Sequence, residues 1–368
     1  MSGRPVVFIA GGGTGGHLMP ALALAARLRE TQPGVEPFLV GAERGVEAQV
    51  LPTRDFRYAL LPMEPIYRRT WWRNVRWPLV LGQLTRRLRQ LFREEQPVAV
   101  LGTGGYASGP VVWWGSHRGL PTAIQEQNAF PGLATRLLAH RVRHVYLGVP
   151  EARRLLKPGS STELFDTGNP ITPPEPGCRA SAMARLGLDP SRPVLLVTGG
   201  SQGSLAINRA LAQWLEQRSD AEKVWQVLWL AGRATYREFS ALARLNGVVV
   251  RDFQDPMADA YAVADLVISR AGMMTVAELC AWGLPAILVP LPTAASDHQT
   301  HNARVLDAAG AACMFLQSTM ERDGLGRVLA PLLTDGSHRQ QMAAAARARG
   351  RPDAARDIVS LFLTLLAS

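Results

Sequence analysis

Residues 6–17 read VVFIAGGGTGGH, which is a run of five apolar residues followed by a glycine-rich turn and a histidine. The same order recurs as VAVLGTGGYASG at 98–109 and as VLLVTGGSQG at 194–203. Short apolar runs that lead through glycine into a helix-like segment are typical of parallel sheets covered on both faces. Further strands are expected at 37–40, 248–250, 266–269 and 286–289. The sequence therefore predicts an α/β protein.

The length of the chain and the spacing of its glycine turns predict two domains. A chain of 368 residues exceeds one ordinary core. Residues 168–177, GNPITPPEPG, are typical of a linker. We therefore expect two Rossmann-like domains that face each other across a cleft, at 1–167 and 178–350. Apolar residues at helical spacing in the tail predict an amphipathic helix over about 353–368, which packs back on the first domain.

The composition indicates a globular cytosolic protein with an anionic partner. Hydrophobic residues make up 47% and charged residues 19%, and no window is apolar enough to span a bilayer. From residues 1–10 we expect no secretory signal. Cys178, Cys280 and Cys313 have no CxxC spacing, which favours reduced thiols over a disulfide or a zinc site. The net charge of +10, carried almost wholly by arginine, favours an anionic ligand or surface.

The three glycine turns are candidate phosphate sites. Such a turn brings backbone N–H groups together at the positive end of a helix. No turn ends in GKS or GKT, which argues against a P-loop nucleotidase. Residues 11–16 formally match the dinucleotide fingerprint, with Glu43 as its acidic partner, so an NAD-dependent oxidoreductase is one alternative. A purely structural turn explains any one of them equally well, but three turns in two domains favour more than one phosphorylated ligand.

Polar side chains in and near these turns can do chemistry. His17 lies where a helix dipole favours a neutral imidazole that accepts a proton, although a capping or packing role is the simpler reading. Tyr106 and Ser108 add hydroxyls beside the second turn, and Ser201 is suited to cap the helix after the third. The run QEQN at 125–128 suits recognition of a hydroxyl-rich ligand or general-base work, with an exposed polar loop as the alternative.

The second half of the chain adds a candidate ribose ligand. Thr275 and Glu278 have the spacing of a capping box, but Glu278 could equally hold a ribose diol. The polar run SDHQTHN at 296–302 lies between apolar runs and contains His298 and His301. No Cys or HExxH pattern accompanies these histidines, so we expect no metal site.

An arginine- and tryptophan-rich segment predicts contact with a membrane. Residues 68–93 hold eight arginines and no acid, interleaved with tryptophans and aliphatic residues. This mixture suits an anionic membrane interface. Single-stranded nucleic acid is the alternative, but no nucleic-acid-binding motif accompanies the segment, and a core helix with a basic outer face explains some of the leucines. The predicted membrane contacts are Arg68, Arg69, Trp71, Trp72, Arg73, Arg76, Trp77, Trp113 and Trp114.

These segments together, in this order, resemble the MurG family of bacterial N-acetylglucosaminyltransferases. The matching stretches are 11–17 with Pro20, 104–110, 126–128 with Gly132, 168–170, 199–203 with Asn208, and 264–302. The resemblance implies a GT-B fold and an inverting transfer from UDP-N-acetylglucosamine to undecaprenyl-diphosphoryl-MurNAc-pentapeptide (lipid I). It also implies peripheral attachment to the cytoplasmic face of the bacterial inner membrane, with no cofactor or metal.

The resemblance also implies roles for single residues. The general base is His17, with Glu126 as its rival. The acceptor diphosphate is assigned to Gly13, Gly104, Gly105, Tyr106 and Ser108, and residues 14–17 lie on the same acceptor side, with 14–16 also bordering the donor. The donor falls to Thr14, Gly15, Gly16, Asn128, Ser201, Gln202, Gly272, Met273, Met274, Thr275, Glu278 and Gln299, with Glu278 on the ribose and Gln299 on the sugar.

The chain departs from the family pattern at three places. Gln125 stands where the family commonly has histidine, and Thr172 stands where it often has an arginine that touches the donor. Residues 271–274 read AGMM in place of a Ser-Gly-Ala-like loop. A related GT-B transferase with another donor sugar or lipid acceptor therefore stays open. A separate alternative is a regulatory protein that binds a nucleotide sugar, which would keep the glycine loops but need no base.

Overall fold

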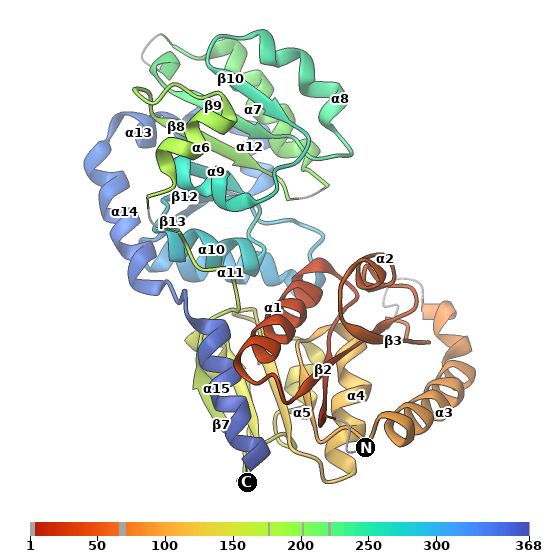
Figure 1. The fold of residues 1–368 in the computed structure, drawn as a ribbon. Helices are drawn as coiled ribbons and strands as arrows, with labels where there is room; N and C mark the ends of the chain where they lie inside the picture. Colours follow the sequence, from red (N-terminus) through yellow and green to blue (C-terminus); the bar gives the residue numbers. More distant parts are fainter. Residues whose placement is uncertain (1–3, 66–70, 176, 201, 220–221, 368) are drawn as a thin grey trace. The chain divides into compact units, whose positions relative to one another are not determined.

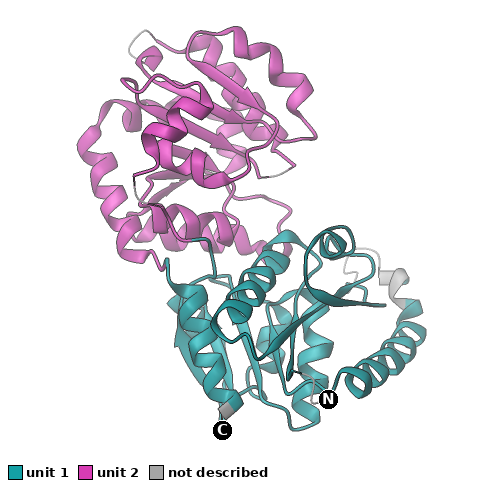
Figure 2. Ribbon diagram, viewed as in Figure 1, with its two compact units in different colours: residues 1–172, 352–368 teal, residues 173–351 magenta. Residues whose placement is uncertain are grey.

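The computed structural model describes residues 4–65, 71–175, 177–200, 202–219 and 222–367. The chain forms two compact units (Figures 1 and 2). Unit 1 comprises residues 1–172 and 352–368, and unit 2 comprises residues 173–351. The division falls inside the proline-rich segment 168–177, and the last segment of the chain returns to unit 1.

Within its described residues, unit 1 is built on a seven-stranded parallel sheet with the strand order β3-β2-β1-β4-β5-β6-β7. The strands are β1 (Val6–Ala10), β2 (Glu36–Ala42), β3 (Arg57–Leu61), β4 (Ala99–Gly102), β5 (Thr122–Glu126), β6 (His144–Leu147) and β7 (Glu163–Asp166). Because the order reverses at β1, the carboxyl ends of β1 and β4 form the switch point where α/β sheets bind ligands. Both predicted glycine turns of unit 1 leave the sheet there.

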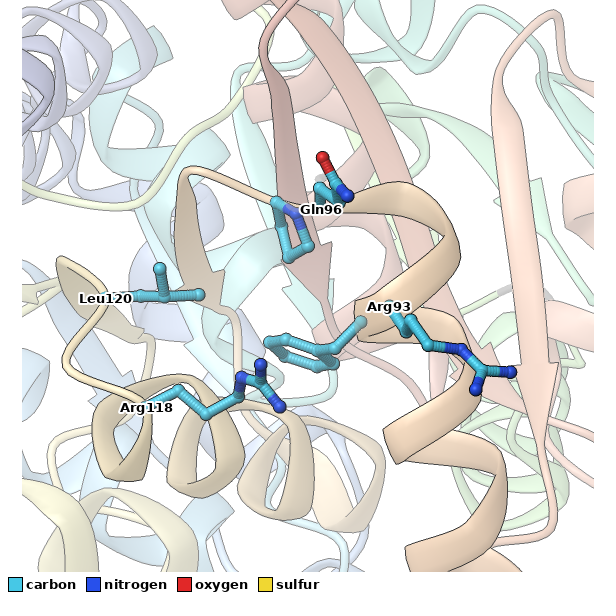
Figure 3. Close-up of a pocket in the computed structure, with 6 residues that line it drawn as sticks. Arg93, Gln96, Arg118 and Leu120 are labelled. Carbon is cyan, nitrogen blue, oxygen red and sulfur yellow. The ribbon is translucent and has the colours of Figure 1, made fainter.

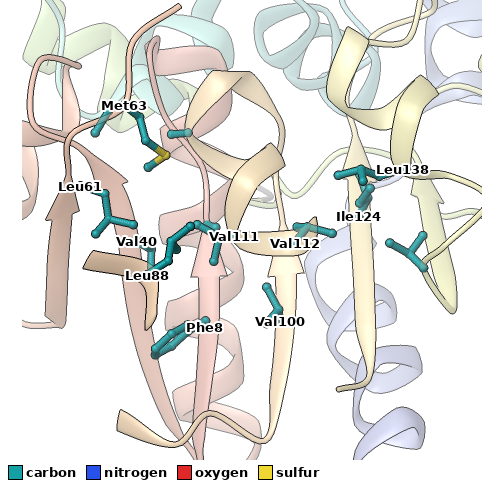
Figure 4. Packing of buried hydrophobic residues seen from close by; sticks show 14 of the residues in the cluster. Phe8, Val40, Leu61, Met63, Leu88, Val100, Val111, Val112, Ile124 and Leu138 are labelled. Carbon is teal, nitrogen blue, oxygen red and sulfur yellow. The ribbon is translucent and has the colours of Figure 1, made fainter. Parts of the chain in front are cut away.

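Helices cover both faces of this sheet, and the alternation of side chains along β1 determines which face each helix packs on. Those described in unit 1 are α1 (Gly15–Thr31), α2 (Glu47–Val50), α3 (Trp77–Glu95), α4 (Gly105–His117), α5 (Leu133–Leu138) and α15 (Ala354–Ala367). Phe8 faces a cluster with Leu88 of α3 and Val111 of α4 (Figure 4). Ile9 faces the opposite cluster, which contains Leu24 of α1.

Helix α15 completes the second of these clusters. Ile358 and Phe362 are buried there against α1, although they lie more than three hundred residues further along the chain. Unit 1 is therefore discontinuous in sequence, since its core needs residues from both ends of the chain.

In the described part of unit 2, six parallel strands lie in the order β10-β9-β8-β11-β12-β13. They are β8 (Val194–Thr198), β9 (Gln226–Leu230), β10 (Val248–Arg251), β11 (Leu266–Ser269), β12 (Ala286–Leu288) and β13 (Ala312–Met314). Here the order reverses at β8, so the switch point lies between the carboxyl ends of β8 and β11. The third glycine turn and the segment 270–278 start from those two ends.

The helices described in unit 2 are α6 (Arg179–Leu186), α7 (Leu205–Gln217), α8 (Tyr236–Phe239), α9 (Met257–Val263), α10 (Met273–Trp282), α11 (His298–Ala308), α12 (Gln317–Asp323), α13 (Gly326–Thr334) and α14 (Gly336–Arg349). The core on one face of the sheet contains Leu195, Trp229 and, from α7, Leu211. The predicted fold class, two parallel-sheet α/β units, is confirmed.

Candidate active site

The loop between β1 and α1 leaves the N-terminus of α1 open. Thr14 is the N-cap residue, and its side chain makes no capping hydrogen bond. Thr14, Gly15 and Gly16 are exposed, and a Cβ added at Gly15 would meet no described atom within 4 Å. The first N–H groups of a 17-residue helix therefore face open space at a switch point, which favours an anionic ligand.

Glu47, which the sequence pattern did not indicate, anchors the same loop. Its side chain is 0% exposed. Its carboxylate accepts hydrogen bonds from the N–H of Gly13, at 3.0 and 2.9 Å, and from the N–H of Ala42, at 2.8 Å. A Cβ at Gly12 or Gly41 would overlap the Glu47 side chain. The loop is therefore built around a buried carboxylate, which sets its conformation.

This arrangement bears on two expectations. Glu43, considered as the acidic partner of the glycine fingerprint, is exposed, and the acid that reaches the loop is Glu47, four residues later. Gly13, which is predicted to contact a diphosphate, donates its N–H to Glu47. The N–H groups that face open space belong to the residues after Gly13.

The loop after β4 packs directly on the first loop, and glycine is required at both of its central positions. Gly104 and Gly105 have φ values of +87° and +76°. A Cβ at Gly104 would lie 2.8 Å from Nδ1 of His17, and a Cβ at Gly105 would overlap the carbonyl oxygen of Gly12. The positive φ and the close approach both exclude larger residues. The two glycines hold the His17 ring between the loops.

The two hydroxyl residues of this loop are placed differently. The Tyr106 ring lies so close to Gly13 that a Cβ on Gly13 would contact its edge. Ser108 is buried, and its Oγ donates to the carbonyl oxygen of Gly105 at 3.5 Å. Tyr106 therefore lines the loop pair, whereas Ser108 packs inside α4.

His17 is half-buried and hydrogen-bonded through one ring nitrogen. Its Nδ1 lies 3.0 Å from Oε1 of Gln127. Gln127 and Gln125 are buried, as is Asn169 from the segment that follows β7. The first three residues of the polar run 125–128 are therefore buried, and the run is not an exposed loop.

Glu126 is also buried, and its carboxylate is fully occupied. Oε1 accepts the backbone N–H of Asn128 at 3.0 Å and its Nδ2 at 3.3 Å. Oε2 accepts the N–H of Gly132 at 3.0 Å and the hydroxyl of Thr135 at 2.5 Å. Four donors fill the acceptor sites of a carboxylate. Glu126 therefore anchors half-buried Asn128 and the start of α5.

The third glycine turn begins the site in unit 2. Ser201 lies outside the described residues, and Gln202 is exposed. Ser204 is the N-cap of α7, and its Oγ accepts the N–H of Ile207 at 3.4 Å. The capping role considered for Ser201 therefore belongs to Ser204. Gly203 has a φ of +82°, and a Cβ there would overlap the chain at residues 231–232.

The neighbouring loop, after β11, ends in the N-terminus of α10. Gly272 is the N-cap, and a Cβ there would meet no described atom within 4 Å. Met273 is buried, whereas Met274 and Thr275 are half-buried. Because the helix begins at Met273, Thr275 lies inside its first turn and cannot act as N-cap. The interpretation of Thr275 and Glu278 as a capping box is wrong.

Glu278 instead lies one turn into α10. Its Oε2 accepts the hydroxyl of Tyr261 at 2.7 Å. Burial raises the pKa of Glu278 above its ordinary value of 4.5, and the Tyr261 hydrogen bond opposes that shift. Gln299 of α11 uses its Oε1 to accept the N–H of Leu291 at 3.0 Å, which leaves its Nε2 able to donate.

The arginine- and tryptophan-rich segment divides into a core face and an exposed face. Arg68 and Arg69 lie outside the described residues, as do the side chains of Trp71 and Arg73. Leu84, Leu88, Leu91 and Phe92 of α3 are buried in the unit 1 core. The exposed apolar side chains before and at the start of α3 are Trp72, Val75, Leu79 and Leu81.

We define Trp72, Val75, Leu79 and Leu81 as the exposed apolar patch, and Arg76 and Trp77 lie within the same stretch of chain. Arg76 is exposed and Trp77 half-buried. On α4, Trp113 is exposed and stacks on His117 with ring centroids 5.3 Å apart, while Trp114 is half-buried. The core interpretation therefore holds for the second half of α3, and the interface interpretation remains for its start.

A hollow lies near the amino ends of two central strands of the unit 1 sheet, β4 and β5 (Figure 3). It is lined by Phe92, Arg93, Gln96, Pro97, Arg118 and Leu120. Pro97 and Leu120 precede β4 and β5, so the hollow is at the amino ends of these strands. The glycine loops follow the carboxyl ends of β1 and β4, so the hollow lies at the other end of the strands.

No described helix combines the length and the apolar character needed to cross a bilayer. Nor do three or more His, Cys, Asp or Glu side chains gather as a metal site in the described ranges.

Comparison with known proteins gives full-length matches. The N-terminal domain model of glycosyltransferase family 28 matches residues 7–147, and its C-terminal domain model matches residues 194–358. A UDP-N-acetylglucosamine–N-acetylmuramyl-(pentapeptide) pyrophosphoryl-undecaprenol N-acetylglucosamine transferase of Chlorobaculum tepidum is 39% identical, over 98% of this chain and 100% of that protein. The enzyme of the same name from Moorella thermoacetica is 38% identical, over 98% and 99%.

A solved structure agrees with these relatives. The crystal structure of Acinetobacter baumannii MurG superposes with a TM-score of 0.77 at 28% identity, covering 98% of this chain and 99% of that one. Both family models and the full-length identity point the same way. The chain belongs to the MurG family of N-acetylglucosamine transferases, within glycosyltransferase family 28.

Proposed function

We propose that the protein transfers N-acetylglucosamine from UDP-N-acetylglucosamine to the muramoyl sugar of lipid I, with inversion and without a metal. The relatives that support this substrate pair are named for the same transfer and match along almost the whole chain. The observation that carries the proposal is the position of His17, a half-buried imidazole beside the open N-terminus of α1. An anion site and a base thus lie together on unit 1.

In the proposed reaction, a hydroxyl of the acceptor sugar attacks the anomeric carbon of the donor. The hydroxyl proton passes to Nε2 of His17, the new glycosidic bond forms, and the bond to UDP breaks on the opposite face. The acceptor diphosphate would lie against the N–H groups of Gly15 and Gly16 and beside Tyr106. Glu126 is a poor candidate for the base because four donors already occupy its carboxylate.

Most of the proposed donor contacts belong to unit 2. The open N-terminus of α10, capped by Gly272, suits the UDP diphosphate because helix dipoles favour anions there. Glu278 can accept hydrogen bonds from the ribose hydroxyls, and Gln299 can donate to the sugar through Nε2. Asn128, Ser201 and Gln202 complete the proposed donor contacts.

The experiment that tests the function is transfer of radiolabelled N-acetylglucosamine from its UDP donor to a short-chain lipid I analogue, with EDTA present. Lipid II analogue and UDP in equal amounts are the expected products. Parallel reactions with UDP-glucose and with an undecaprenyl phosphate acceptor test the related-transferase alternative. Folded protein that binds UDP and makes no product from lipid I would overturn the proposal, and Thr172 would then be the first position to vary.

We expect UDP to bind more weakly as the pH falls. Ribose hydroxyls donate to an ionised carboxylate, so protonation of Glu278 removes an acceptor. Its pKa is raised above 4.5, so affinity is retained above that raised pKa and lost as the pH falls through it. Calorimetric titration should show the dissociation constant rising by up to about tenfold per pH unit below that point.

The control for this pH dependence is Glu278→Gln. It cannot ionise, so it should bind UDP more weakly at neutral pH and with a flat profile across the same range. Equal pH profiles for the two proteins would show that another group causes the effect.

We propose further that unit 1 attaches the protein to an anionic membrane surface at the cytoplasmic face of the inner membrane. The support is the exposed apolar patch at the start of α3, where Trp72 is 59% and Leu79 is 73% exposed. Arg76, Arg86 and Arg87 around it are exposed as well. An apolar face beside arginines is the composition that anionic interfaces bind.

Replacing Leu79 by serine should weaken binding to vesicles that contain anionic lipid by about ten- to a hundredfold. The side chain is exposed in the free protein, so its only burial would be in the lipid, worth roughly 1.5–3 kcal/mol. Co-sedimentation measures the partition coefficient. Val224→Ser in unit 2, where the valine is 57% exposed, is the matched control. Equal partitioning of both variants and the parent would contradict the proposed surface.

A further inference from the structure

Three buried side-chain amides form a continuous chain that ends on His17. Asn169 donates through Nδ2 to the backbone oxygen of Gln127 at 3.2 Å, which turns its Oδ1 toward Gln125. Gln125 donates through Nε2 to that Oδ1 at 2.9 Å, and its Oε1 accepts a short hydrogen bond from Nε2 of Gln127. Gln127 Nε2 also donates to the backbone oxygen of Thr103 at 2.8 Å.

The direction of every bond in this chain is fixed by backbone carbonyl groups, because a carbonyl oxygen can only accept. Thr103 O lies beside one end of the Gln127 amide, so that end must be the NH₂ group. The opposite arrangement would place Oε1 of Gln127 against two carbonyl oxygens in a buried site, where unpaired acceptors are costly. Oε1 of Gln127 therefore faces His17.

An amide oxygen facing His17 Nδ1 at 3.0 Å requires that nitrogen to carry the proton. We propose that Gln127, held by Gln125 and Asn169, fixes neutral His17 as the Nδ1–H tautomer and so leaves the lone pair on Nε2. Within the described part of unit 1, Nε2 has no hydrogen-bond partner. Gln127 is thus a positioning residue that acts through His17.

This inference rests on the proposed function in one respect, the use of His17 as base. An imidazole with its proton on Nε2 would present a donor to the acceptor hydroxyl and could not remove its proton. With the proton on Nδ1, Nε2 accepts the hydroxyl proton, and the resulting imidazolium keeps its Nδ1–H bond to Gln127. The chain of hydrogen bonds from Asn169 through Gln125 and Gln127, which we call the amide relay, therefore holds the imidazole in place both before and after proton transfer.

The relay also gives a physical reason for Gln125, where the chain departs from the family pattern. At this position the side chain must accept one hydrogen bond from Gln127 and donate one to Asn169. A glutamine amide does both, and so does a neutral imidazole, which has one N–H and one bare nitrogen. We expect Gln125→His to retain the tautomer of His17, and Gln125→Leu to leave the Gln127 amide held only by the backbone carbonyl oxygens of Thr103 and of residue 125.

The decisive measurement is a long-range ¹H–¹⁵N correlation spectrum of the full chain labelled with ¹⁵N-histidine, at a pH where His17 is neutral. The chain has seven histidines, and the signals of His17 are those lost in His17→Ala. The expected spectrum shows a protonated Nδ1 and a bare Nε2 in the parent protein. A parent spectrum with the proton on Nε2 overturns the inference, whatever any variant does.

The causal role of Gln127 is tested with Gln127→Leu, which removes the acceptor at similar size. We expect the His17 signals to move toward the Nε2–H form and kcat to fall by roughly 10²-fold, while the affinity for UDP is unchanged. Gln213→Leu, an exposed position on α7, is the matched control and should alter neither readout. An unchanged tautomer in folded Gln127→Leu overturns the role of Gln127.

Failure of the inference and failure of the proposed function give different results. If His17→Ala keeps full transfer activity, His17 is not the base. The inference about the His17 tautomer is then still decided by the parent spectrum alone. If transfer requires His17 but the parent spectrum shows Nε2–H, the function stands and the relay is refuted.

Discussion

Replacing His17 by alanine should lower kcat for sugar transfer by about 10²- to 10⁴-fold, the contribution typical of a general base. The affinity for UDP should not change, because the proposed UDP contacts made by Gly272 and Glu278 belong to unit 2. The loop should survive the change, since Glu47 and not the imidazole holds it. Steady-state kinetics with a lipid I analogue, together with calorimetric UDP binding, measures the two quantities separately.

Glu126→Gln is the informative comparison for His17→Ala. A carboxamide at 126 would turn an NH₂ group toward two of the four donors that Glu126 now binds. We therefore expect a lower melting temperature and a smaller loss of kcat than in His17→Ala. A drop in kcat larger than that of His17→Ala, in a protein of unchanged stability, would transfer the role of base to Glu126.

The second large effect is expected at Glu47. Glu47→Ala leaves the N–H groups of Gly13 and Ala42 without their acceptor, and each unsatisfied buried group costs about 1–3 kcal/mol. The free energy of unfolding should therefore fall by about 2–5 kcal/mol. Urea denaturation followed by circular dichroism measures this change.

Two controls separate the anchoring carboxylate from a general effect of removing an acid. Glu47→Gln keeps an acceptor oxygen of the same size, so its loss of stability should be clearly smaller. Glu30→Ala removes an exposed carboxylate from a surface pair with Arg27, which is worth little. Equal stability of Glu47→Ala and Glu30→Ala would show that the loop does not depend on Glu47.

The sequence was most informative where a local pattern has one structural solution. A buried parallel strand must be apolar on both faces, so residues 6–10 and 194–198 predict their strands without any knowledge of the partners. The glycine turns follow because the chain needs positive φ at Gly104 and Gly105. The positions of both switch-point loops, and hence of His17, follow from the same pattern.

The sequence was least informative where a role depends on a partner far along the chain. Glu47 reads as an ordinary surface acid, because nothing local shows that Gly13, 34 residues earlier, turns its N–H toward it. The predicted N-cap residues differ from the observed ones for a similar reason. The path of the preceding loop makes Ser204 the N-cap of α7 and Gly272 the N-cap of α10, whereas Thr275 has only the sequence spacing of a capping box.

The return of α15 to unit 1 has a consequence for how the protein is made. While the ribosome is still building unit 2, the α1 face of the first sheet lacks Ile358 and Phe362, and its apolar surface stays uncovered. The core of the unit that carries His17 can therefore be completed only after α15 has left the ribosome. A chain that ends before α15 cannot complete that core, so a chain in which unit 1 is fully packed has already been extended through residues 173–351.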